Sequence, residues 1–422
     1  MSSGYFPSPW PAEDAGAARL ASPHDTPGLR IQPGEGLACT TRSTVLSTMT
    51  VLGESREVYL LTHSALRAHI GLPTTACVER IDPITLKTLD SSGRLPGGPM
   101  WPGGLAVHAS GDLIAIYGRF AHRLNRDCEV LDRFELPVNA PYNSFVILDN
   151  GLVVTKNLSE TLAAVLTTLT PDQLTRAAPD ITCPEPSVAR LSALGNTVYV
   201  VGVRSLFRYH WSEPLQRLVL DTGWRFDYIG TGSQTFGWDV VLDGQNAWFM
   251  DNGKHRYRVS MVGAGVSPTA NRLIRVSLGN AADHALIDVC GKAGGSITNP
   301  PLVDLKRHIV VGFDSANREL RAWRVHAPNS NLTPLWQKSA FGCASHLILY
   351  PDTGELVVND YRRHGEEIVV LQIENGQELG RVRPGGVTQG VVFPSVGWNR
   401  DFYWSSMGKL TRVFVQACAT SR

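Results

Sequence analysis

The stretch SFVILDNGLVVTKN at 144–157 decides the fold, because it contains one complete structural unit in miniature. A short apolar run is followed by an Asp-Asn-Gly turn and by a second apolar run that ends in polar residues. Asn-Gly turns tolerate the positive φ that a tight β-turn demands, so the stretch predicts a β-hairpin. The same pattern recurs at 239–253, 302–315 and 347–361, with looser copies at 105–118, 188–202 and 391–406 and the least regular copy at 43–63.

A second hairpin follows nearly every first one, as in 77–92, 123–137 and 367–385. Two hairpins per unit give four strands per unit. The second strands of the units end at His63, Gly118, Asn157, Gly202, Asp251, Asp314, Asp360 and Ser405, which are 55, 39, 45, 49, 63, 46 and 45 residues apart. This period is typical of propeller blades. The sequence therefore predicts an all-β chain with a single β-propeller of about eight four-stranded blades, or seven if 43–92 is partly an insertion.

The end of the repeat indicates how the ring closes. After KLTRVFVQA (409–417) the chain stops within five residues, so the last unit has only three strands and an unpaired edge. A ring covers such an edge by borrowing a strand from the other terminus. The segment 29–32 is the candidate for this strand. We therefore expect an N-terminal arm at 1–27, with one or two helical turns at 12–21, and a propeller domain at 28–418.

Composition excludes several partners. The chain has 39 basic and 38 acidic side chains, a formal charge of +1, so nothing favours nucleic acid or an anionic membrane as a partner. No apolar run is long enough to span a membrane, and the first twenty residues lack the pattern of a signal peptide. The seven cysteines form no CxxC pair, which favours reduced thiols and a cytoplasmic location.

Candidate site residues follow from the geometry of a propeller, in which the innermost strand of each blade lines a central channel. The residues at the starts of these strands are Asn143, Glu185, Trp238, Asp239, Asn299, His346 and Gln389. The oxygen-bearing members Asn143, Glu185, Asp239 and Asn299 are the ligand types that Ca²⁺ or another hard divalent cation prefers. The alternative is a wet channel, in which these groups bond to each other and to trapped water.

The blade form at 143–151, an Asn followed by a hydrophobic strand and an Asp-x-Gly turn, resembles the gluconolactonase and strictosidine-synthase-like propellers. Gly34-Glu35-Gly36 is similar to the Glu-Gly opening of the lactonases. The resemblance implies that one Glu and several Asn or Asp residues at inner-strand starts hold a divalent cation or line a pocket. Two features depart from it: over twenty residues separate Glu35 from the second strand near Val58, and these propellers usually have six blades.

Other catalytic motifs are missing from the sequence. It has no GxSxG elbow, HExxH pair or GxxxxGK[ST] loop, and its Gly-rich pieces lie between blades with no following helix, so no nucleotide is expected. The tryptophans share no common offset within the blades, so no quinone cofactor (PQQ) is expected.

Two functions remain open. The first is a small-molecule enzyme with a polar site at the channel mouth, carrying out lactonase-like hydrolysis or a rearrangement. There a cation would polarise a carbonyl oxygen, Glu185 or Asp239 would activate water and His346 would shuttle protons. Asn143, Trp238, Asn299 and Gln389 would contact the substrate at a channel mouth covered by the 254–270 loop and the N-terminal arm. The alternative is a non-catalytic scaffold that binds a protein partner through its top face.

Overall fold

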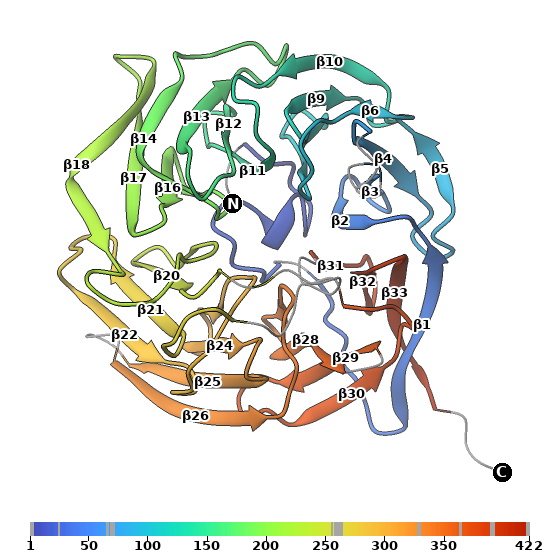
Figure 1. The fold of residues 1–422 in the computed structure, drawn as a ribbon. Coiled ribbons are helices and arrows are strands. Elements are labelled where there is room, and N and C mark those ends of the chain that lie inside the picture. The colour runs from blue at the N-terminus through green and yellow to red at the C-terminus, as the bar shows by residue number, and fades with distance from the viewer. Residues whose placement is uncertain are drawn as a thin grey trace.

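Eight antiparallel sheets form a ring in the computed structural model (Figure 1). The structure describes residues 4–23, 26–64, 67, 72–254, 256, 265–326, 331–362, 365–388 and 393–418. Within these residues each sheet has four strands in antiparallel order from the channel to the rim, and one sheet has a fifth short strand, so the protein is an eight-bladed β-propeller with almost no helix. The predicted count of eight is confirmed, because the irregular 43–92 region forms a full blade instead of an insertion.

The first four blades each run from an innermost strand at the channel to an outermost strand at the rim. Blade 1 has an extra short strand, β6 (Leu95–Pro96), that pairs with β4. In order from the channel outward, blade 1 consists of β2 (Ser47–Leu52), β3 (Val58–His63), β4 (Thr75–Ile81) and β5 (Thr88–Ser91), and blade 2 of β7 (Gly104–Val107), β8 (Leu113–Tyr117), β9 (Phe120–Leu124) and β10 (Val130–Glu135). Blade 3 consists of β11 (Tyr142–Ile147), β12 (Val153–Asn157), β13 (Ala163–Leu169) and β14 (Ile181–Pro186). Blade 4 consists of β15 (Ser192–Leu194), β16 (Thr197–Val201), β17 (Ser205–Ser212) and β18 (Arg217–Asp227).

The other four blades complete the ring, and the last of them takes its outermost strand from the N-terminal part of the chain. Blade 5 consists of β19 (Val241–Leu242), β20 (Asn246–Met250), β21 (Arg272–Ser277) and β22 (His284–Asp288), and blade 6 of β23 (Leu302–Asp304), β24 (Ile309–Asp314), β25 (Glu319–His326) and β26 (Asn331–Ser339). Blade 7 consists of β27 (Ile348–Tyr350), β28 (Glu355–Arg362), β29 (Gly365–Gln372) and β30 (Glu378–Val382). Blade 8 consists of β31 (Ser395–Val396), β32 (Asp401–Ser406), β33 (Lys409–Ala417) and β1 (Glu35–Ser43).

The hydrophobic core lies between neighbouring blades. All residues of the second strands β3, β8, β20 and β24 are buried except Thr62. Both faces of such a strand pack against another sheet, which explains its continuous apolar sequence. The outermost strands β10 and β22 instead alternate between exposed and less exposed residues, because one of their faces meets solvent.

The ring closes as the sequence predicts, but with a different segment. β1 pairs antiparallel with β33 over nine residues, from Glu35 opposite Ala417 to Ser43 opposite Lys409. The predicted segment 29–32 is wrong for this role. Leu29 is instead fully buried, and its backbone N–H donates to the Glu355 carboxylate at 2.8 Å, so the segment serves as the connection that leads into β1.

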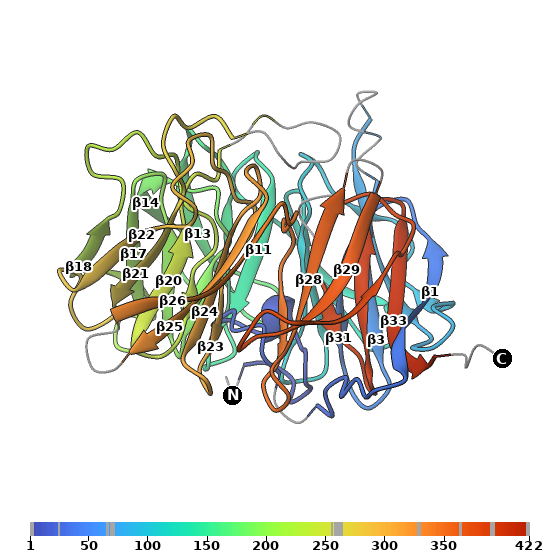
Figure 2. The same ribbon diagram turned by 90° about the horizontal axis from the view of Figure 1, so that it is seen from below.

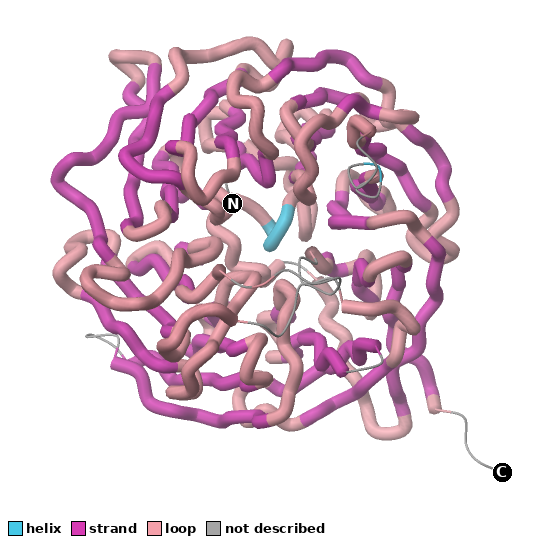
Figure 3. The backbone as a smooth tube through the Cα atoms, in the orientation of Figure 1, coloured by secondary structure: helices cyan, strands magenta, loops and turns pink. Residues whose placement is uncertain are grey.

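The N-terminal arm, residues 4–23, enters the central channel (Figures 2 and 3). It contains one 3₁₀ turn, η1 (Glu13–Ala15), in place of the one or two helical turns predicted for 12–21. Among the described residues no helix has the length and apolar character needed to cross a membrane. All seven cysteines are described, and all are free thiols.

Candidate functional site

The inner strands bind the N-terminal arm through backbone hydrogen bonds. An innermost strand pairs on one side only, so it leaves N–H groups facing the channel that need an acceptor. Carbonyl groups of the arm accept from five blades. The pairs are Leu52 to Trp10 (2.8 Å), Val107 to Pro11 (2.8 Å), Ala193 to Ala17 (2.9 Å), Leu242 to Ala18 (2.9 Å) and Leu349 to Ala21 (2.9 Å), donor first. The Tyr5 hydroxyl accepts from a sixth blade at the Ile147 N–H, 2.9 Å away.

The arm adopts a backbone that most residues avoid. Asp14, Ala15, Arg19 and Ala21 all have positive φ between 49° and 65°, and Gly16 has φ of 131°. A non-glycine residue in the left-handed region costs about 1–2 kcal/mol, so such a run persists only where the surroundings impose it. The contacts with the channel wall therefore determine the path of the arm.

Arg19 is the first of two buried cations in the channel. Its guanidinium contacts the Glu13 carboxylate, lies 3.0 Å from Asp14 Oδ2 and donates to the Leu191 carbonyl at 2.9 Å. Burial works against the charged form, but the surrounding carboxylates outweigh it and raise the pKa of Arg19 above its ordinary value. The arm thus carries a fixed positive charge into the ring together with two carboxylates of its own.

Arg190, just before β15, is the second buried cation. Its Nη1 lies 2.6 Å from Glu13 Oε2 and also donates to the Asn143 carbonyl. The guanidinium stacks 4.0 Å above the centre of the Phe393 ring. Burial lowers the pKa of Arg190, although an arginine remains charged at neutral pH.

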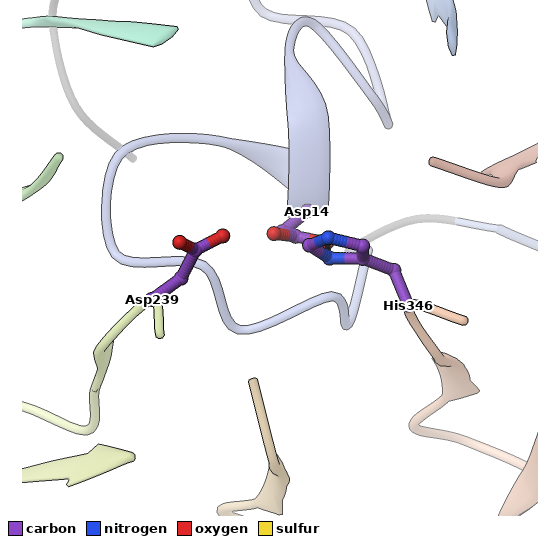
Figure 4. A group of neighbouring side chains, drawn as sticks. All are labelled: Asp14, Asp239 and His346. Atoms are coloured by element: carbon purple, nitrogen blue, oxygen red, sulfur yellow. Dashed lines mark hydrogen bonds and ion pairs between the residues drawn. The ribbon is translucent and has the colours of Figure 1, made fainter. Parts of the chain in front are cut away.

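Asp14, Asp239 and His346 converge in the channel, as Figure 4 shows. His346 Nδ1 is 2.8 Å from Asp14 Oδ1. Asp239 accepts from the Arg190 backbone N–H at 2.7 Å, and its other oxygen is 3.9 Å from Arg19 Nη1. Burial alone would raise the pKa of Asp14, but His346 and Arg19 overcome it and hold that pKa below its ordinary value.

These six residues, Glu13, Asp14, Arg19, Arg190, Asp239 and His346, form what we call the channel network. Its three carboxylates face two guanidinium groups and the imidazole of His346. Each ion is expensive to bury alone, and the network compensates each with an opposite charge. Asp14 is 3% exposed, and Asp239 and His346 are 1% exposed, so solvent barely reaches them. The small cavity beside Glu13 and Arg19 has about 10 Å³, which is room for about one water molecule.

The structure brings together only part of the sequence-predicted site. Asp239 and His346 meet in the channel. Asn143 and Asn299 instead link neighbouring blades, since their amide groups donate to the Val188 carbonyl at 3.0 Å and the Ala344 carbonyl at 2.6 Å. Trp238 is buried, and its indole N–H donates to the Gly253 carbonyl at 3.2 Å.

Glu185 lies apart from this group. It belongs to β14, the outermost strand of blade 3, and not to the start of an inner strand. Its carboxylate accepts from the backbone N–H of Arg204 at 2.8 Å and from the Ser205 hydroxyl at 2.7 Å, where it caps a turn of blade 4. Gln389 and most of the predicted 254–270 loop lie outside the described residues.

The four predicted cation ligands therefore do not form one cluster, since Glu185 faces blade 4. The acidic and imidazole groups that do converge are Asp14, Asp239 and His346, whose ligand atoms lie within 4.8 Å of one another. However, Arg19 already contacts two of them, and a cation placed there would be repelled by it. The predicted Ca²⁺ site stays a prediction.

Reasoning from the sequence missed four members of the network: Glu13, Asp14, Arg19 and Arg190. Three of them lie in the arm, where AEDAGAARLA (12–21) predicted one or two helical turns. The signal was present in the charges, because this otherwise small and apolar segment carries two acids and one arginine within seven residues.

Lys156 of β12 is a further buried charge, outside the network. It is fully buried, and among the described residues its Nζ donates to two backbone carbonyls, at 3.3 Å from Ser187 and 3.5 Å from Asn157. Burial lowers the pKa of Lys156 to about 7. Within the described residues Lys156 forms no ion pair with a carboxylate, and the Coulombic attraction of Asp239 offsets only part of the effect of burial.

Comparison with known proteins supports the fold and leaves the family open. No protein-family model matches the chain, and no curated protein matches its sequence. The structure is similar to BamB from Moraxella catarrhalis (11% identity, 90% of this chain and 97% of that one, TM-score 0.56). It is also similar to a quinohemoprotein alcohol dehydrogenase from Comamonas testosteroni (10% identity, 98% and 81%, TM-score 0.63) and to the Neurospora crassa Pan2 WD40 domain (8% identity, 91% and 96%, TM-score 0.52).

Identities this low show the fold alone. The similar structures include an enzyme and a WD40 domain, so they favour neither of the two functions left open by the sequence. They support a β-propeller but not the gluconolactonase and strictosidine-synthase-like family in particular.

The first prediction concerns Glu13, the carboxylate shared by both buried arginines. Replacing Glu13 by Gln leaves two guanidinium groups undercompensated, so we expect the free energy of unfolding to fall by about 3–5 kcal/mol. Urea unfolding followed by circular dichroism measures this loss. The control is Asp352→Asn, which breaks an exposed pair with Lys306 (65% and 56% exposed side chains) and should cost at most about 1 kcal/mol. Equal effects of the two substitutions would show that the channel network does not stabilise the fold.

The second prediction concerns Lys156 and pH. The unfolded chain holds the lysine proton up to a pKa near 10.5, whereas the folded chain releases it near pH 7, so stability rises with pH between these values. From pH 7 to pH 9 the gain from this group is about 2 kcal/mol. Lys156→Met should lack that gain and should be more stable than the natural protein at pH 7. A variant that is less stable at pH 7, with an unchanged pH profile, would contradict this assignment.

Proposed function

We propose that this chain is a non-catalytic propeller scaffold that binds a protein partner. The observation that carries the proposal is the burial and the bonding of Asp239 and His346, the two predicted catalytic residues that meet in the channel. Both are 1% exposed, and both are engaged in holding the N-terminal arm.

A catalytic acid or base must reach the proton that it transfers. His346 Nδ1 is taken by Asp14, and the Phe393 ring covers the imidazole with the two ring centres 4.2 Å apart. Asp239 is engaged by the Arg190 backbone and by Arg19. A substrate could contact these groups only after the arm had left the channel.

The network instead supplies rigidity. Glu13 and Arg19 of the arm connect the Asn143 carbonyl of blade 3 to Asp239 before blade 5, by way of Arg190. Asp14 connects blade 7 to the same network through its hydrogen bond with His346. A ring whose blades are tied through its centre presents its outer surface in one fixed arrangement, which reduces the entropy lost on binding a partner.

The small-molecule enzyme predicted from the sequence is the second candidate. The observation that favours it is the convergence of Asp14, Asp239 and His346 within 4.8 Å, an arrangement of ligand types that divalent cations use. It also requires an exit of the arm, for which the described contacts give no route.

Two channel variants test the scaffold against the enzyme. His346→Gln and Asp239→Asn should lower thermal stability, yet each folded variant should retain the same stoichiometric protein partner as the natural chain when purified from its source cells and sized by chromatography. Because a scaffold has no catalytic activity, we expect no turnover of a panel of lactones and aryl esters by the natural chain or by either variant. Turnover that either substitution abolishes would overturn the proposal, and so would a natural chain that carries no partner.

Metal content provides a separate test of the second candidate. Because Arg19 occupies the space between the carboxylates, we expect less than one tightly bound ion per chain, measured by elemental analysis after dialysis against a chelator. About one Ca²⁺ or other divalent ion per chain, lost in Asp239→Asn but kept in Glu185→Gln, would favour the enzyme and place the cation in the channel.

A further inference from the structure

The outer rim of the ring carries a groove between blades 1 and 2, which we call the blade 1–2 groove. Its volume is about 400 Å³, within the range of about 300–1,000 Å³ typical of binding pockets. One wall is the segment that leads into and forms β6, and the other is β10. Figure 1 shows β6 close to β9 and β10 at the edge of the molecule.

The β10 wall offers an unpaired strand edge. β10 is the outermost strand of its sheet and pairs only with β9 among the described strands. A β-bulge between Val130 and Asp132 interrupts the alternation of side chains. As a result Val130 and Leu131 are neighbours that are both exposed, at 44% and 43%.

The two walls also carry positive charge. Arg94 on the blade 1 side and Arg133 on the blade 2 side are both exposed, and within the described residues no carboxylate forms an ion pair with either. Asp132, the acidic residue that lines the groove, is already bound to Arg123 at 2.8 Å. The Arg133 guanidinium lies over the Phe120 ring, 5.8 Å from its centre, which limits its freedom.

A buried polar atom lies in the lining as well. His122 of β9 is 1% exposed, and its Nε2 has no hydrogen-bond partner within the described part of the chain. Burial, with a contribution from Arg133, lowers the pKa of His122 to about 4, so the ring is neutral at pH 7 and can donate one N–H. A buried polar atom without a partner is costly, and a ligand group that hydrogen-bonds to it removes that cost.

We propose that the blade 1–2 groove binds an extended segment of a partner protein in which an Asp or Glu side chain is flanked by apolar residues. The segment adds its backbone to the free edge of β10, and its apolar side chains cover Val130 and Leu131. Its carboxylate lies between Arg94 and Arg133. This inference rests on the proposed scaffold function and names the chemistry of the partner.

The features of the groove favour this occupant over others. A basic segment would meet two uncompensated arginines, and a purely apolar one would bury them without a counter-charge. A neutral polar segment would leave the charges of both arginines without a counter-charge. An acidic side chain satisfies both arginines, whereas the bulged pair of apolar residues requires apolar neighbours.

A peptide-display experiment on the full-length protein tests the inference. A library of random ten-residue peptides is selected on the natural chain, and the enriched peptides are measured by fluorescence polarisation. We expect Asp or Glu next to apolar residues, with binding that weakens as salt rises. The double charge reversal Arg94→Glu with Arg133→Glu should weaken binding at least tenfold, and Leu131→Asp should weaken it similarly.

The matched control is Arg217→Glu, an exposed arginine on the outermost strand of blade 4. Thermal melting checks that each variant is folded. Three outcomes would overturn the groove assignment. The selected peptides could bind the double variant and the control equally, the selection could enrich basic or purely apolar peptides, or it could enrich none. Sedimentation that shows self-association abolished by the double variant would also overturn it, since a second copy would then be the occupant.

The proposed scaffold function can be correct even if the groove assignment fails. If the stoichiometric partner of the natural chain remains bound to the double variant, the groove is wrong and the scaffold stands. If no partner is found at all, the scaffold itself is wrong.

Discussion

The pairing of two buried arginines with carboxylates in the central channel is the interaction on which the centre of this protein depends. Arg19 and Arg190 lie 1% and 2% exposed at the side chain, and Glu13 binds both. Moving an ion out of water costs several kcal/mol, and the cost returns if any opposite charge is removed. The network therefore adds to the backbone hydrogen bonds with which five blades hold the arm in the ring.

This arrangement ties distant parts of the chain to one another. Repeat proteins are often stabilised mainly by contacts between adjacent repeats. In this propeller the arm accepts backbone hydrogen bonds from five blades, and β1, a little further along the chain, completes blade 8. The segment before residue 44 therefore makes contacts around most of the ring. We infer that this propeller unfolds more cooperatively than a linear array of the same blades would.

The same constraint decides how the site is interpreted. Asp239 and His346 have the side chains of a catalytic pair, but both are engaged by the arm, His346 by Asp14 and Asp239 by Arg19. The outer rim is different, because in the blade 1–2 groove Arg94 and Arg133 have no opposite charge of their own in the described structure. Charges that are compensated inside the channel contribute to stability, and charges left uncompensated at the rim are available to a partner.

The sequence by itself determined the hairpins, the four-stranded units, a number of seven or eight blades and the need for an N-terminal strand to complete the last blade. These features are local: an Asn-Gly turn and an alternating strand form from residues close in sequence. Only the tertiary structure decided that residues 35–43 supply this strand, that Glu185 caps a turn of blade 4, and that the arm fills the channel. Asp14 and His346 meet across 332 residues of sequence. No local pattern encodes such a contact, since the neutralisation of buried charge depends on which groups the closed ring brings together.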